Sequence, residues 1–242
     1  MTLIDPFVAV IPAAGVGKRL GSKESKQYLL LRGQSILESS IKPLLTLSEC
    51  KGICIVISSE DSHWRSLDIS TRDNISFIEG GLTRIKSSMN GINFWLKEKE
   101  LFSNILIHDA VRPCLQSKDL GNLLAEFQKS KDLGDGRNLD GMILAIKSAN
   151  TLKLIHNSTS IIKETFDRSY VWEALTPQIF SREALTKASN LYKDSENYTD
   201  ESSLVESFGG KVGIVEGSSN NIKITTKEDL KLAEAILLLQ NN

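Results

Sequence analysis

Short apolar runs alternate along this chain with longer segments whose apolar residues recur every three or four positions. Continuous apolar runs are typical of strands buried on both faces, and the longer spacing is typical of helices that cover a sheet. The runs predict strands at 7–11, 52–57, 75–78, 105–107, 142–146 and 211–215. The spaced segments predict helices at about 35–47, 83–97, 117–131, 181–191 and 226–240, with another that begins near Thr199. This order indicates an α/β fold, a single Rossmann-like domain over 1–242 with a mostly parallel, twisted sheet and helices on both faces.

Local signals refine some of these elements. Ser35 and Glu38 stand three residues apart before an apolar segment, which predicts a capping box. Pro43 lies inside that helix, where we expect a kink or an early end. Thr199 is expected to cap the helix that follows it, and the run Ile222–Ile224 resembles a strand.

The segment from about 147 to 170 interrupts the strand and helix order. Two short strand-like runs, Thr151–Ile155 and Ser160–Thr165, flank a polar stretch and predict a β-hairpin. A projecting hairpin exposes its edges and needs a partner, most simply a second copy of itself. We therefore expect a β-arm that forms a homodimer.

Composition and charge exclude several classes of protein. The chain has 242 residues with 29 Lys and Arg against 30 Asp and Glu, so its net charge of −1 gives no electrostatic case for nucleic acid or an anionic membrane. No apolar run approaches the ~20 residues of a membrane span, and the N-terminus does not resemble a leader. The sparse cysteines, Cys50, Cys54 and Cys114, fit buried side chains in a reducing compartment, so we expect a cytoplasmic protein.

The stretch Pro12–Gln27 is the first candidate for a binding site. Small residues and glycines follow a buried strand, which lets backbone N–H groups approach a ligand closely. Lys18, Arg19, Lys23 and Lys26 follow, and such cations suit a polyanion such as a triphosphate. The stretch matches neither of the common phosphate-binding fingerprints, so a tight turn with solvated lysines stays an alternative at this point.

Later motifs, taken together with this loop, carry a resemblance to a known family. In order along the chain they are Pro12-Ala-Ala-Gly15, Lys26-Gln-Tyr28, His108-Asp-Ala-Val-Arg-Pro113, Phe166-Asp-Arg168 with Trp172, Thr176-Pro-Gln178, Thr199-Asp-Glu201 and Asn221-Ile-Lys-Ile-Thr225. With these motifs in family order, the chain resembles the 2-C-methyl-D-erythritol 4-phosphate cytidylyltransferase family over essentially its whole length.

The resemblance implies a nucleotidyltransferase domain, Mg²⁺ or another divalent cation, and transfer of a cytidylyl group from CTP to a polyol phosphate. A ribitol-5-phosphate cytidylyltransferase of the same fold is the alternative, and a catalytically dead scaffold is another. The segment Thr165–Trp172 and the Pro-Ala-Ala-Gly opening favour the methylerythritol branch. Retention of the motif cations argues against the dead scaffold.

Roles for individual residues follow from the resemblance alone. The family's transition-state cations correspond to Arg19 and Lys26, and its substrate-phosphate cations to Arg168 and Lys223, with Arg168 reaching the neighbouring subunit. His108 is expected to support a backbone turn, since a phosphate nucleophile needs no base. Cytidine contacts are implied for Ala13, Ala14, Gly15, Gly81 and Ser87, ribose and metal contacts for Asp109 and Ala110, water-mediated Mg²⁺ binding for Asp109, and further substrate contacts for Thr151 and Thr176.

The chain departs from the family pattern at two places. Ser25 stands where the family usually has a proline, which loosens the loop but keeps Lys26 in register. Before the hairpin, Lys147 replaces a proline and Asn150 replaces an acidic residue. These changes bear on the geometry of the arm more than on the chemistry.

Overall fold

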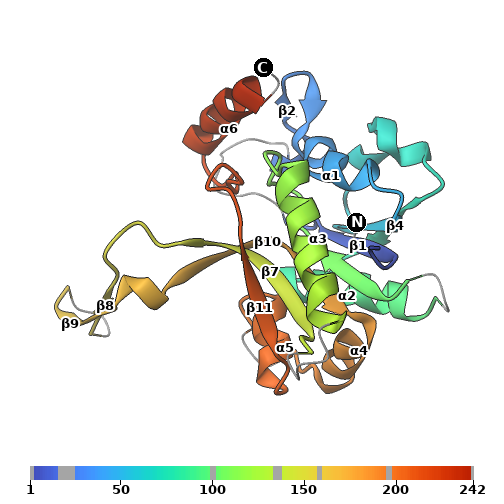
Figure 1. Ribbon diagram of the computed structural model, residues 1–242. Coiled ribbons are helices and arrows are strands. Elements are labelled where there is room, and N and C mark those ends of the chain that lie inside the picture. Colours follow the sequence, from blue (N-terminus) through green and yellow to red (C-terminus); the bar gives the residue numbers. More distant parts are fainter. Residues whose placement is uncertain are drawn as a thin grey trace.

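The computed structural model describes residues 3–15, 25–98, 102–132, 138–156, 160–194 and 198–240 (Figure 1). One seven-stranded sheet has the order β11–β7–β10–β6–β1–β4–β5. Its neighbouring strands are parallel except for β10, which is antiparallel to both β6 and β7. The predicted mostly parallel α/β sheet is therefore confirmed. The strands are β1 (Phe7–Pro12), β4 (Cys50–Ile57), β5 (Ile75–Glu79), β6 (Asn104–Ile107), β7 (Gly141–Lys147), β10 (Trp172–Ser181) and β11 (Val212–Glu216).

Helices cover both faces of this sheet because side chains alternate along each strand. Phe7, Ala9 and Ile11 of β1 pack in one cluster with apolar residues of α1 and α3. Val8 and Val10 point to the other face and pack with residues of α2, α4 and α5. These helices are α1 (Ile36–Leu45), α2 (Arg84–Leu96), α3 (Ser117–Asp132), α4 (Arg182–Leu191) and α5 (Glu201–Ser207).

Helix ends follow the sequence signals with one exception. Ser35 and Glu38 form the predicted capping box, and α1 continues through Pro43 before it ends at Leu45. The cap predicted at Thr199 is wrong by one residue. Asp200 caps α5, because its carboxylate accepts the backbone N–H of Ser203.

Strand β10 carries no strand signal in the sequence. Its pairing with β7 is irregular between Ala174 and Gln178, where Pro177 removes a backbone donor. A proline argues against a central strand, and the irregularity is the feature that accommodates it here.

Helix α2 packs so close to the sheet that Gly91 has no room for a side chain. A Cβ placed on Gly91 would lie 2.4 Å from Val10 Cγ1 and 3.0 Å from Val56 Cγ2. The glycine therefore lets the helix approach β1 and β4, and this approach places its first turn beside the carboxyl ends of those strands.

The predicted hairpin is present as an arm (Figure 1). Strands β8 (Lys153–Ile155) and β9 (Ile162–Thr165) pair antiparallel, and every residue in them is exposed. The chain leaves the sheet along β7 and returns along β10, where Trp172 pairs with Lys147.

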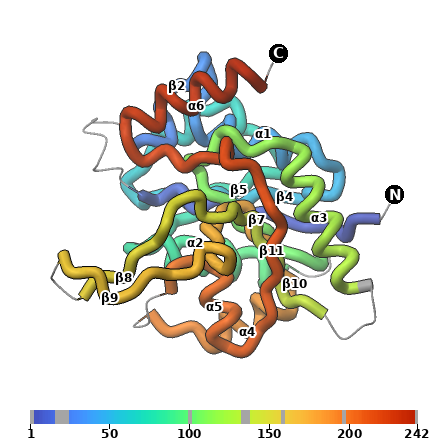
Figure 2. Tube along the Cα trace, turned by 60° about the vertical axis from the view of Figure 1, so that its left-hand side comes forward, coloured from blue at the N-terminus to red at the C-terminus, as the bar shows by residue number. Residues whose placement is uncertain are grey.

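The C-terminal helix lies at the upper end of the molecule in Figure 1. Helix α6 (Lys227–Gln240) lies beside the small hairpin of β2 (Leu30–Leu31) and β3 (Gln34–Ser35) in both views (Figures 1 and 2). The strand expected at 222–224 is wrong, because this segment forms an irregular connection. Ile224 nevertheless donates its N–H to Val111 O, which holds the segment against the loop after β6. None of the helices in the described ranges is long and apolar enough to cross a membrane.

Candidate active site

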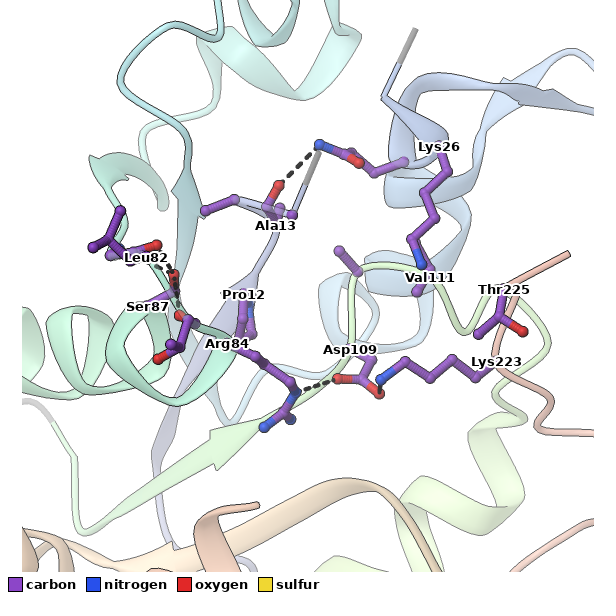
Figure 3. Close-up of a pocket in the computed structure, with 16 residues that line it drawn as sticks. Pro12, Ala13, Lys26, Leu82, Arg84, Ser87, Asp109, Val111, Lys223 and Thr225 are labelled. Carbon is purple, nitrogen blue, oxygen red and sulfur yellow. Dashed lines mark hydrogen bonds and ion pairs between the residues drawn. The ribbon is translucent and has the colours of Figure 1, made fainter. Parts of the chain in front are cut away.

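A cavity of about 430 Å³ opens at the carboxyl ends of β1, β5 and β6 (Figure 3). This is the edge at which parallel sheets commonly bind ligands. Sequence-predicted residues that line it are Ala13, Ala14, Gly15, Lys26, Gly81, Ser87, Asp109, Ala110 and Lys223. The structure therefore brings together segments that lie far apart in the sequence. Arg19, like Lys18 and Lys23, lies outside the described residues.

The loop after β1 is tied to the turn that carries Lys26. Ala13 donates its N–H to Val56 O, and its own carbonyl accepts the buried side-chain amide of Gln27 at 2.9 Å. Lys26 lines the cavity and donates from Nζ to Ile224 O at 3.2 Å. The next residue but one, Tyr28, donates its hydroxyl to Asp61 at 2.7 Å. These contacts fix both the small-residue backbone and the Lys26 ammonium group.

The loop after β5 forms the opposite wall. Gly81 donates its N–H to Ser87 Oγ at 3.1 Å, and the Ser87 hydroxyl donates to Thr83 O. A Cβ on Gly80 would lie 2.6 Å from the Cβ of Ala14, so the glycine allows the two loops to meet. The two loops thus meet at small residues, which leaves room beside their backbone where they line the cavity.

Asp109 lies at the centre of a cluster of cations. Its Oδ1 accepts Arg84 Nε at 2.9 Å, and its Oδ2 accepts Lys223 Nζ at 2.9 Å (Figure 3). The same Oδ2 also accepts Arg112 Nε at 3.2 Å. Burial alone would raise the pKa of the Asp109 carboxyl. The attraction of these three cations outweighs burial and holds that pKa far below its usual range. Asp109 is therefore ionised at any physiological pH.

Arg84 has a second carboxylate partner, Glu201, which is fully buried behind the cavity. Burial would lower the pKa of the Arg84 guanidinium, but Glu201 and Asp109 raise it above its ordinary value. The sequence did not single out Arg84, Arg112 or Glu201. Arg112 and Glu201 lie within quoted motifs and Arg84 lies between Gly81 and Ser87, but nothing local indicates their pairing.

His108 and Thr176 support the loop from below. The Thr176 hydroxyl accepts the backbone N–H of Asp109 at 3.0 Å and lies 3.1 Å from His108 Nδ1. Both side chains are buried, and burial lowers the pKa of His108 to about 4 despite the neighbouring carboxylate. His108 is thus neutral near pH 7, which fits the predicted supporting role. Thr176 uses its hydroxyl in the same support, so its position does not favour the predicted substrate contact.

Two predicted residues lie on the arm instead of the cavity. Thr151 and Arg168 are exposed, and Arg168 donates to Ala149 O at 3.1 Å on its own arm. Neither residue lines the cavity formed by the described part of this chain.

The donor set for a metal ion is small. Among the described residues, no three His, Cys, Asp or Glu side chains gather closely enough to hold a metal by themselves. Asp109 accepts from three cations, and an ionised carboxylate offers about four acceptor positions. One position on Asp109 is therefore left, which suits a water-mediated contact to a metal whose other ligands come from a phosphate group.

The walls and charges together suit a phosphorylated nucleotide. The backbone of the loops after β1 and β5 can contact a flat base, and the cations Lys26, Arg84, Arg112 and Lys223 exceed the carboxylates Asp109 and Glu201. Such an excess favours a polyanion and stabilises charge that develops at phosphorus.

Comparisons with known proteins agree with this geometry. The family model for IspD, 2-C-methyl-D-erythritol 4-phosphate cytidylyltransferase, matches residues 7–239. The enzyme of that name from Haemophilus influenzae (strain PittEE) is 39% identical over 232 residues, 96% of each chain. The Aliivibrio fischeri (strain ATCC 700601 / ES114) enzyme is 35% identical over 240 residues, 98% of this chain and 97% of the relative.

Solved structures give the same result. The Francisella tularensis 2-C-methyl-D-erythritol 4-phosphate cytidylyltransferase matches with a TM-score of 0.79 and 30% identity, covering 96% of this chain and 99% of that one. The 4-diphosphocytidyl-2C-methyl-D-erythritol synthase of Anaerococcus prevotii matches with a TM-score of 0.79 and 29% identity, covering 96% of both chains. This chain therefore belongs to the 2-C-methyl-D-erythritol 4-phosphate cytidylyltransferase family of nucleotidyltransferases.

Proposed function

We propose that the cavity at the carboxyl ends of β1, β5 and β6 is where this enzyme transfers a cytidylyl group from CTP to 2-C-methyl-D-erythritol 4-phosphate. A phosphate oxygen of the acceptor attacks the α-phosphorus of CTP, a new P–O bond forms, and the bond to the leaving pyrophosphate breaks. The products are 4-(cytidine 5'-diphospho)-2-C-methyl-D-erythritol and pyrophosphate, an isoprenoid precursor and its by-product. The observation that carries the proposal is the cation cluster around Asp109 beside small-residue backbone in one cavity.

The cytosine base is proposed to lie between the loops after β1 and β5. Gly81 and Ser87 present polar groups there, and the stretch Ala13–Gly15 presents backbone without large side chains. A pyrimidine edge is read by main-chain N–H and C=O groups only where nothing bulky intervenes. The ribose then lies toward Asp109 and Ala110 on the loop after β6.

Charge neutralisation is the main task of the protein in this reaction. Both reactants are anions, so their repulsion must be offset for the phosphate oxygen to approach the α-phosphorus. Lys26 is proposed to act on the α-phosphate, together with Arg19 from the stretch outside the described residues. Lys223 is proposed to hold the phosphate of methylerythritol phosphate, and its 37% exposed side chain has room to move from Asp109 to that phosphate. The acceptor phosphate is already ionised at neutral pH, so no general base is needed.

A divalent cation such as Mg²⁺ is proposed to bind with the triphosphate. Asp109 would contact it through water, and the ion would neutralise charge on the triphosphate and the leaving pyrophosphate.

The second subunit is proposed to complete the site. Arg168 belongs to the substrate-phosphate pair implied by the family, yet in a single chain it lies on the exposed arm, with its guanidinium at Ala149 O. The arm also exposes Leu154, Ile155, Ile162 and Phe166, an apolar surface that a second arm would cover in a homodimer. Arg168 and Thr151 would then act in the partner's cavity. A cytoplasmic location remains a prediction of the sequence.

Ribitol 5-phosphate is the alternative acceptor, and the family assignment does not favour it. Pyrophosphate release tests both acceptors in the same assay, with CTP, Mg²⁺ and either polyol phosphate. We expect release with methylerythritol phosphate at a kcat/KM at least ~100-fold above that with ribitol phosphate. Equal rates with the two acceptors, or equal rates with UTP in place of CTP, would contradict the proposed function.

A further inference from the structure

Glu201 is a fully buried carboxylate that lies behind the cavity and does not line it. A buried charge is costly unless it is paired and hydrogen-bonded. Both oxygens of Glu201 accept from Arg84, with Nη1 at 3.0 and 3.2 Å and Nη2 at 3.2 Å. The planar fork of the guanidinium is thus directed at Glu201, away from the cavity.

This arrangement leaves Arg84 one group for Asp109. Nε donates to Asp109 Oδ1 at 2.9 Å, so Asp109 Oδ2 stays open to Lys223 at 2.9 Å and Arg112 at 3.2 Å. An unrestrained arginine prefers to bind a carboxylate through two parallel N–H groups. Without Glu201, the Arg84 fork would therefore take both oxygens of Asp109 and compete with Lys223.

Glu201 itself is held in place by the central strand β10. Gln178 donates its side-chain amide to Asp200 Oδ2 at 2.8 Å and accepts the backbone N–H of Ser202 at 3.1 Å. The residues on both sides of Glu201 are thus anchored to one buried glutamine, which is 1% exposed. This anchoring fixes the position of the Glu201 carboxylate relative to the Arg84 guanidinium.

We propose that Glu201 is a positioning residue for cytidylyl transfer. It holds the Arg84 fork and thereby keeps one oxygen of Asp109 available to Lys223, which sets Lys223 for the phosphate of the acceptor. The inference rests on the proposed function, in which Lys223 binds methylerythritol phosphate. A purely structural role, in which Glu201 only balances the charge of Arg84, would affect folding and not one substrate more than the other.

The test separates these roles with Glu201→Gln and a matched control on the same helix, Ser203→Ala. Ser203→Ala removes the hydroxyl that accepts the backbone N–H of Asp200 at 3.3 Å, so it weakens the start of α5 without touching Arg84 or Gln178. Steady-state pyrophosphate release gives kcat and both KM values. We expect Glu201→Gln to raise the KM for methylerythritol phosphate by about tenfold or more while the KM for CTP changes less than about twofold. Ser203→Ala should lower stability in urea and leave both KM values unchanged.

A double-mutant cycle with Arg84→Gln tests the route of action. Because Glu201 acts through Arg84, adding Glu201→Gln to the Arg84→Gln enzyme should change the KM for methylerythritol phosphate by less than about twofold. Should Glu201→Gln fail to fold, Glu201→Asp, which keeps the charge, replaces it in the same cycle with the same expected pattern.

The proposal is overturned if Glu201→Gln alters both KM values equally, if it changes only kcat in parallel with Ser203→Ala, or if its effect is undiminished without Arg84. Absence of pyrophosphate release by the wild-type chain is a different result. It would overturn the proposed function, and the inference would fall with it.

Discussion

Replacing Asp109 by asparagine isolates the charge that holds the cation cluster together. The substitution keeps the shape of the side chain and removes the negative charge that faces Arg84, Arg112 and Lys223. Arg84 keeps Glu201 as a partner, so it is not left unpaired. Lys223 is 37% exposed and can turn to water, so its pair contributes only about 0–1 kcal/mol.

The loss of stability in Asp109→Asn therefore depends mainly on Arg112. Its side chain is 10% exposed. Without the Asp109 carboxylate it keeps the hydrogen bond to Asn221 O at 2.7 Å, but no other opposite charge in the described part of the chain lies at hydrogen-bond distance. Removing one partner of a buried ion pair costs about 3–5 kcal/mol. The remaining hydrogen bond places the expected loss at the lower end, about 3 kcal/mol in the free energy of unfolding.

Urea unfolding followed by circular dichroism measures this loss, with Asp119→Asn as the matched control. Asp119 is also buried, but its carboxylate accepts the backbone N–H of Ser218 at 3.0 Å. The asparagine oxygen can still accept this N–H, so the replacement should cost about 1 kcal/mol, the difference between a hydrogen bond to a charged acceptor and one to a neutral acceptor. If Asp109→Asn cost no more than Asp119→Asn, the charge of Asp109 would not be what holds Arg112 in the cluster.

Three further predictions follow from the arm, the buried histidine and the close packing of α2. Lys26→Ala and Arg168→Ala should each be nearly inactive, whereas mixing them should restore up to about a quarter of the wild-type rate, since half of the dimers then carry one complete site. No recovery on mixing would contradict the action of Arg168 in the partner's cavity. As the pH falls from about 6.5 toward 4, His108 takes up a proton in the unfolded chain before the folded one. The neutral His108 side chain should therefore contribute about 3 kcal/mol to the free energy of unfolding above pH 6.5, and this contribution should be lost toward pH 4. If the free energy of unfolding of His108→Gln depended on pH in the same way as that of the wild type, this prediction would be wrong. Gly91→Ala should lower the free energy of unfolding by about 1–3 kcal/mol, because the new Cβ meets Val10. Gly121→Ala should not lower it, because the space around Gly121 is open. Equal urea midpoints for the two variants would contradict close packing at Gly91.

Many elements of the fold can be predicted from short stretches of sequence. Apolar runs and helical spacing are local properties, so the order of strands and helices could be predicted, and so could the Ser35 and Glu38 cap. The cavity could be located as well, because a strand that ends in small or charged residues places them at the carboxyl edge of a parallel sheet. The hairpin was visible because turn residues separate its two runs.

Other features depend on partners far along the chain. Strand β10 lies between β6 and β7 although Pro177 argues against a central strand, and only the irregular pairing around Pro177 resolves the conflict. Arg84 meets Asp109 across 25 residues and Glu201 across 117, so no window of sequence shows that the three belong together. The cap at Asp200 in place of Thr199 is a one-residue ambiguity between two good capping side chains.

One cavity, at the carboxyl ends of β1, β5 and β6, is proposed to hold CTP for cytidylyl transfer. A crystal structure of the enzyme with CTP and Mg²⁺ would show where the nucleotide binds. We expect density for cytosine beside Gly81 and Ser87, and for the triphosphate beside Lys26. Density for CTP at any other place on the chain, with this cavity occupied by solvent, would contradict this placement.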